Sequence, residues 1–135
     1  MSRPVPGRRA LVEEDDASQH RFGADFESAQ CLLVSEVRAL LDAAKDQREK
    51  SGQVDIITRT HAYCERFSRL ASRETIKEVR ALFPSAMHPF DFAQLANLGC
   101  ETVEEALSLI PSLHGVMDHE SLQRLLDDLA SLRQF

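Results

Sequence analysis

Apolar residues recur at three- and four-residue steps along most of the chain, and this spacing constrains the fold more than any other feature. Phe26, Ala29, Leu33, Val37 and Leu40 follow such steps near the start, as several leucines do near the end. Steps of this size place side chains on one face of an α-helix. No stretch alternates β-branched and polar residues with the two-residue period of a strand. The sequence therefore predicts an all-α fold class.

Capping and helix-breaking residues divide this pattern into separate helices. A long first helix is expected from Asp25 to about residue 50, and a second over about 54–69. Shorter helices are expected over about 73–83, between Pro89 and Gly99, from Thr102 to Pro111, and from Asp118 onward. Serine, threonine and aspartate cap helix starts, proline suits a first turn or ends a helix, and glycine closes one. Thr102 and Glu105 also fit a capping box.

Three regions are predicted from this organisation. Residues 1–24 form an extended arm, because Pro4 and Pro6 oppose regular structure and the acidic run at 13–16 repels itself. Residues 25–71 form a long helix pair, and residues 72–135 form a compact bundle of short helices. A chain of 135 residues fits one such domain with an added arm.

Charge and cysteine content narrow the possible functions. The formal net charge is −6, and residues 84–135 carry all of it, with two basic and eight acidic side chains. This balance argues against broad, charge-driven binding to DNA. Three widely spaced cysteines are typical of free thiols in a reducing compartment. The apolar runs are far shorter than the roughly 20 residues that span a bilayer, so no membrane segment is expected.

Residues 59–80 have a local excess of basic side chains: Arg59, Arg66, Arg69, Arg73, Lys77 and Arg80. This Arg59–Arg80 basic face could contact phosphate or an acidic partner. It could equally be a solvated helix face with intrahelical ion pairs, which is the commoner case.

Residues with catalytic or metal-binding chemistry are few and poorly placed for it. The glycines are scattered, so there is no phosphate-binding loop, and no G-x-S-x-G or H-E-x-x-H motif occurs. His114 and His119 match no strong zinc spacing. Cys64 lies three residues after His61, but it falls on an apolar stripe where a buried thiol is ordinary. We therefore expect no catalytic residues, no metal and no cofactor.

The predicted first helix is apolar over more than half its circumference between residues 26 and 44. A helix with so wide an apolar arc must be covered on two sides. The chain's own bundle can cover one side, which favours an oligomer or a permanent partner for the other. The alternative is that the second helix closes that side.

Several strings stand in a distinctive order along the chain: Glu-Glu-Asp-Asp-Ala at 13–17, Cys-Leu-Leu-Val-Ser-Glu-Val at 31–37, Arg-Phe-Ser-Arg at 66–69, Arg-Glu-Thr-Ile at 73–76, Leu-Ala-Asn-Leu at 95–98, Ile-Pro-Ser-Leu at 110–113 and Leu-Asp-Asp-Leu at 126–129. Together they resemble the family of fourth subunits of eukaryotic RNA polymerase II, over residues 12–135. No single string is decisive, but their order and spacing are specific.

The resemblance implies a function that composition does not show. Such a subunit has no catalysis of its own, lies in the nucleus and pairs with the seventh subunit to form the polymerase stalk. The heterodimer docks on the polymerase core, acts in initiation, and meets emerging RNA mainly through the partner. Residues 72–135 are similar to the helicase-and-RNase-D C-terminal (HRDC) domain. Their acidic charge favours protein contact over direct phosphate binding.

The resemblance also implies which residues meet the seventh subunit. The residues carried over are Phe22, Phe26, Leu32, Leu33, Val37, Leu40, Leu109, Ile110, Pro111 and Leu113. Leu109 and Ile110 have a competing interpretation as bundle core. Arm residues 11–22 could lie extended on the partner as an added strand. The alternative function is a free-standing helical module that binds RNA through the Arg59–Arg80 basic face.

Overall fold

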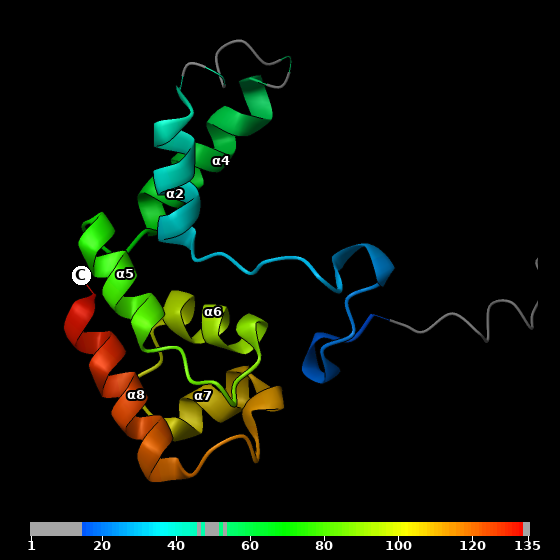
Figure 1. The fold of residues 1–135 in the computed structure, drawn as a ribbon, viewed down its shortest axis with the longest axis vertical. Helices are drawn as coiled ribbons and strands as arrows, with labels where there is room; N and C mark the ends of the chain where they lie inside the picture. The colour runs from blue at the N-terminus through cyan, green and yellow to red at the C-terminus, as the bar shows by residue number, and fades with distance from the viewer. Residues whose placement is uncertain (1–14, 46, 48–51, 53, 134–135) are drawn as a thin grey trace, which may run out of the picture. The chain divides into compact units, whose positions relative to one another are not determined.

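Helices make up most of the chain that the structure describes (Figure 1). The computed structural model describes residues 15–45, 47, 52 and 54–133. Its α-helices are α2 (Val34–Ala43), α4 (Val54–Phe67), α5 (Arg73–Ala81), α6 (Pro89–Leu98), α7 (Val103–Leu109) and α8 (His119–Leu132), and its 3₁₀ helices are η1 (Ala17–Gln19), η2 (Ala24–Phe26) and η3 (Pro111–Leu113). Over these ranges there is no strand, only an isolated bridge between Asp16 and Arg21. The all-α prediction is confirmed.

The chain divides into two compact units, residues 1–30 and residues 31–135. In the described part of the first unit, the Asp16 carboxylate caps η1 by accepting a hydrogen bond from the Ser18 N–H at 3.1 Å. The backbone groups of Asp16 and Arg21 pair with each other at 2.8 and 2.9 Å and close a tight turn around η1. The predicted extended arm falls largely on residues 1–14, which lie outside the described residues.

The predicted start of the first long helix is wrong. α2 begins at Val34 rather than at Asp25, while Phe26 lies in η2 and belongs to the other unit. The physical reason is tertiary: the side-chain oxygen of Asn97 on α6 accepts a hydrogen bond from the Val34 N–H at 2.9 Å. In a longer helix, the Val34 N–H would donate to a carbonyl of the preceding turn. Here the Asn97 side chain accepts it instead, so the helix can begin at Val34. Most of the predicted far end, residues 45–50, lies outside the described residues.

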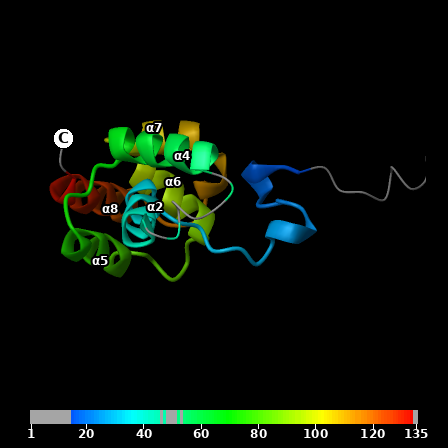
Figure 2. The same ribbon diagram turned by 90° about the horizontal axis from the view of Figure 1, so that it is seen from above.

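The core of the second unit is built mainly from α5 to α8, and α2 lies beside α4 (Figures 1 and 2). Phe92 and Leu95 on α6 are fully buried, and the Phe92 ring stacks on Phe83 with 5.0 Å between centroids. The chain entering α2 adds Leu33 to the same core. From α8 the core takes the predicted leucine seam at Leu122, Leu125, Leu126 and Leu129.

The predicted helix boundaries after residue 54 are largely confirmed because they depend on local capping. The hydroxyl oxygen of Ser72 accepts from the Thr75 N–H at 3.2 Å, and the Asp118 carboxylate accepts from the Ser121 N–H at 2.7 Å. Gly99 closes α6 with φ +68°, in the left-handed region that favours glycine.

The capping box predicted at the start of α7 forms only in part. The Thr102 hydroxyl oxygen accepts from the Glu105 N–H at 3.1 Å, as expected. The Glu105 carboxylate, however, accepts from the N–H of Glu101 at 2.9 Å, one residue before the expected Thr102 N–H. Both interactions still satisfy orphan amides near the start of the helix.

Candidate functional site

The ten residues predicted to meet a partner separate into exposed and buried groups. The exposed members are Phe26, Leu32, Leu40, Leu109 and Pro111. The buried members are Leu33, Ile110 and Leu113, each at most 2% exposed and each part of the core cluster. Phe22 and Val37 are intermediate. Contact with a partner stays a prediction for the whole set, and the exposed members are the ones with side-chain surface to offer.

An apolar groove of about 420 Å³ runs along α2, from Leu32 just before the helix to Ala43 at its end, and is bordered on the other side by α5. Leu32 and Leu40, which are 39% and 57% exposed, line one wall, and Ile76 of α5 lies across from them. Ala39 and Ala43 keep the floor low because their side chains are small. Large aliphatic side chains left open along one groove are a usual mark of an interaction site. We call this feature the α2–α5 groove.

Two basic side chains, Arg73 and Lys77, border the groove from α5. Both are exposed, and neither has an ion-pair partner within the part of the chain that the structure describes. They are four residues apart, so they follow one side of the helix. The groove therefore combines an apolar floor with a positively charged edge.

A partly buried ion pair holds the two walls of the groove together. The Arg80 guanidinium of α5 donates to both carboxylate oxygens of Glu36 on α2, at 2.6 and 2.8 Å, and to the carbonyl of Cys31 at 2.7 Å. Glu36 also accepts from the Leu33 N–H at 2.7 Å. Burial works to raise the pKa of the Glu36 carboxyl, but the hydrogen bonds from Arg80 and Leu33 outweigh it and hold that pKa below its ordinary value of 4.5.

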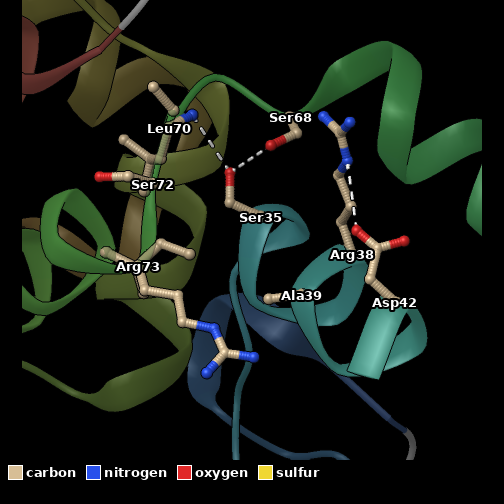
Figure 3. Close-up of a pocket in the computed structure, with 10 residues that line it drawn as sticks. Ser35, Arg38, Ala39, Asp42, Ser68, Leu70, Ser72 and Arg73 are labelled. Atoms are coloured by element: carbon tan, nitrogen blue, oxygen red, sulfur yellow. Dashed lines mark hydrogen bonds and ion pairs between the residues drawn. The ribbon is translucent and has the colours of Figure 1, made fainter. Parts of the chain in front are cut away.

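A second, more polar cleft of about 320 Å³ lies between α2 and the segment that joins α4 to α5 (Figure 3). Its hydroxyls already have partners: Ser35 and Ser68 are 2.7 Å apart, and the Leu70 N–H donates to the Ser35 oxygen at 3.3 Å. The Arg38 guanidinium forms an ion pair with the Asp42 carboxylate on the same helix, with 3.9 Å between nitrogen and oxygen. Most polar groups of the cleft thus bind one another, and Arg73, which also borders the α2–α5 groove, lines its side.

The basic residues between 59 and 80 do not form one continuous face. Arg80 is paired with Glu36, whereas Arg73 and Lys77 border the α2–α5 groove. Arg59 and Arg66 lie on α4, where Arg59 pairs with Asp55 at 3.0 Å and the Arg66 guanidinium lies over the Phe67 ring. Arg69 lies against Gly99 at the end of α6. The structure thus distributes the predicted Arg59–Arg80 basic face over separate settings.

Cys64 and His61, which the sequence analysis singled out, have structural roles in α4. Cys64 is buried as predicted, and burial raises its pKa. His61 reaches Asp42 on α2 with 2.6 Å between Nε2 and the carboxylate oxygen, so it ties α4 to α2. Among the described residues there is no group of three or more potential metal ligands. In the same ranges no helix has the length and apolarity to cross a membrane.

The sequence interpretation missed the contribution of α5 to the site. The sequence predicted Arg80 only as a member of the Arg59–Arg80 basic face, yet Arg80 pairs with Glu36 beside the groove, and Ile76 of the same helix lines the groove. One local signal was available: Glu36 stands three residues after Leu33, the position from which a glutamate can accept the N–H at a helix start. The distant partner Arg80 leaves no such local signal.

Comparison with known proteins agrees with the resemblance seen in the sequence. The model of the family described as RNA polymerase Rpb4 matches residues 31–133. DNA-directed RNA polymerase II subunit rpb4 of Schizosaccharomyces pombe is 39% identical over 132 residues, which cover 94% of this chain and 97% of that protein.

Two further relatives are similar over nearly their whole length. DNA-directed RNA polymerase II subunit rpb4 of Dictyostelium discoideum is 39% identical over 155 residues, covering 100% of this chain and 99% of that protein. DNA-directed RNA polymerase II subunit 4 of Arabidopsis thaliana is 29% identical over 133 residues, covering 91% and 96%. The family match spans the whole described part of the second unit, including the α2–α5 groove and its anchor. The chain belongs to the RNA polymerase Rpb4 family.

Proposed function

We propose that this chain, a non-catalytic stalk subunit of DNA-directed RNA polymerase II, pairs with the seventh subunit through the α2–α5 groove. The observation that carries the proposal is the pair of exposed leucines, Leu32 and Leu40, facing Ile76 along one groove. Burying such side chains against a partner removes apolar surface from water, which drives association. The same leucines belong to the set that the family resemblance assigns to the partner.

The rest of the chain supports a role in contacts between proteins. Residues 84–135, which contain α6 to α8, carry the net negative charge, and we propose that the bundle of α5 to α8 acts as an HRDC-like module that contacts protein rather than phosphate. The heterodimer would dock on the polymerase core in the nucleus and act in transcription initiation. The seventh subunit would make most of the contact with emerging RNA. The proposed partner-binding region is residues 25–71 together with α5.

Replacing Leu40 with aspartate is expected to weaken the heterodimer about thirtyfold, because a charge would face the apolar floor of the groove. The measurement is co-expression with a matching seventh subunit, followed by size-exclusion chromatography with light scattering and titration of the purified partners. Leu40 is 57% exposed, so the variant should fold normally.

Leu98→Asp is the matched control, since Leu98 is 43% exposed at the end of α6 and does not line the groove. It should leave the partner affinity unchanged. A wild-type chain that stays monomeric beside the seventh subunit would contradict the pairing itself. A heterodimer equally sensitive to both substitutions would contradict the groove as its site.

A further inference from the structure

α4 carries an outward strip that neither the core nor the α2–α5 groove uses. Its residues are Ile56, Arg59, Tyr63, Arg66 and Phe67, and we call them the α4 strip. Ile56, Tyr63 and Phe67 are 62%, 58% and 47% exposed. Three large apolar side chains open to solvent on one helix of fourteen residues need an explanation, because a solvated helix face is normally polar.

Helical geometry places the strip opposite the packed face of α4. Steps of three, four, three and one residues connect its members, so they share one side of the helix. His61 lies on the other side, where it reaches Asp42 of α2, and the buried Cys64 lies on the flank between that side and Phe67. The strip is therefore the face that α4 turns away from the rest of the second unit.

The aromatic rings form a platform with guanidinium groups beside it. Tyr63 and Phe67 contact each other with 4.7 Å between ring centroids and an angle of 43° between planes. The Arg66 guanidinium lies 5.6 Å from the centre of the Phe67 ring. With more than half of Tyr63 exposed, a flat group from outside can stack on its ring.

The arginines of the strip can be recruited by an incoming anion at little cost. Arg59 pairs with Asp55 at 3.0 Å, but the two side chains are 79% and 82% exposed. Exposed pairs of this kind contribute little to stability, so a phosphate can replace the carboxylate. The other carboxylate of α4, Glu65, is directed to Arg38 of α2 at 3.8 Å.

We propose that the α4 strip is a binding site for single-stranded RNA. Bases stack on Tyr63 and Phe67, because every base has a π-face, while Arg59 and Arg66 contact the backbone phosphates. The chain belongs to a family of subunits of an RNA polymerase, so single-stranded RNA is the nucleic acid within reach. α4 also lies outside residues 84–135, which carry the net negative charge.

This site is distinct from the proposed pairing with the seventh subunit. The α2–α5 groove offers aliphatic walls and no aromatic ring, whereas the strip offers two rings and two arginines. Two phosphate contacts make a weak, salt-sensitive site that recognises no particular sequence. Such a site suits a chain that holds passing RNA rather than one that selects it.

The test measures the binding of a fluorescently labelled, unstructured RNA of about 12 nucleotides to the full chain by anisotropy over a range of salt concentrations. Tyr63→Ala should weaken binding about tenfold through loss of base stacking. Arg66→Ala should lower the slope of log affinity against log salt by about 0.7, the value for one phosphate contact to a single strand.

Two control variants separate the site from general effects of charge and folding. Tyr63→Phe keeps the ring and should bind RNA as the wild type does. Arg124→Ala removes another exposed arginine, paired with Glu120 at 3.2 Å on α8, and should leave both affinity and salt slope unchanged.

Equal RNA binding by Tyr63→Ala and the wild type would overturn the proposal, as would an equal loss in Arg66→Ala and Arg124→Ala. Loss of heterodimer affinity in Tyr63→Ala with RNA binding intact would assign the strip to a protein interface and also overturn it. Because the RNA measurement uses this chain alone, its result does not depend on the pairing with the seventh subunit.

Discussion

Arg80→Ala is expected to lower the free energy of unfolding by about 3 kcal/mol, because it strips a partly buried carboxylate of its partner. The Glu36 side chain is only 17% exposed, and it receives two of its hydrogen bonds from Arg80. The substitution also leaves the Cys31 carbonyl without its guanidinium donor. Urea unfolding followed by far-ultraviolet circular dichroism measures the change.

Arg124→Ala is the matched control for this loss. The Arg124–Glu120 pair is exposed, at 66% and 86%, so its removal should change the free energy of unfolding by less than about 0.5 kcal/mol. Arg80→Lys should fall between the two, because lysine keeps the charge but cannot make the paired contacts of a guanidinium. Equal effects of Arg80→Ala and Arg124→Ala would contradict the assignment of Arg80 as the anchor of the groove.

The same ion pair predicts a pH dependence. The folded pKa of Glu36 lies below its ordinary value of 4.5, so the pair's contribution is fully present above that pH. It is lost as pH falls from 4.5 through the lower folded pKa. In Arg80→Ala the burial of Glu36 remains, but of the compensating hydrogen bonds only the one from the Leu33 N–H is left, so this variant has less stability to lose to acid. The stability gap between wild type and Arg80→Ala should therefore narrow below pH 4.5 in urea titrations, and a constant gap would contradict this.

The elements that sequence reasoning predicted well are those whose ends are decided locally. Ser72, Gly99 and Asp118 end or begin helices through contacts within a few residues, and the structure confirms each of them. The start of α2 depends on a distant partner as well as a local one, because Asn97, which is 63 residues away from Val34, accepts from the Val34 N–H beside the local bond from the Leu33 N–H to Glu36. No local pattern reports such a partner. The period of three and four residues before Val34 therefore suggested an α-helix where the chain forms only the short 3₁₀ helix η2, followed by residues outside any helix.

The candidate site was predictable only in part, for a related reason. Spacing placed Leu33 and Leu40 on one helical stripe, but Leu33 is 1% exposed whereas Leu40 is 57% exposed. Which leucine the bundle covers depends on the position of α6, which is set by the fold and not by the period of α2. Likewise, Glu36 and Arg80 are 44 residues apart, so their ion pair could not be predicted from the local sequence around either residue. Sequence identified the apolar surface but not its anchor.

Phe92→Ala is expected to lower the free energy of unfolding by about 4 kcal/mol, the largest single effect expected for this chain. Phe92 is fully buried in α6, and its ring stacks on Phe83 at 5.0 Å with 28° between planes. Removing it leaves a cavity in a packed core that can relax only in part. Urea unfolding at neutral pH measures the loss, and the midpoint should fall without a change of slope.

Phe67→Ala makes the matched comparison, because the same side chain is removed from a surface. Phe67 is 47% exposed and contacts Tyr63 and Arg66 rather than the core, so its loss should cost less than about 1.5 kcal/mol. The two variants should thus separate stability from binding. Phe92→Ala weakens the fold, whereas Phe67→Ala keeps the fold and weakens binding to single-stranded RNA. If Phe67→Ala instead destabilised the chain as much as Phe92→Ala, the α4 strip would have to be regarded as part of the core rather than as a surface for RNA.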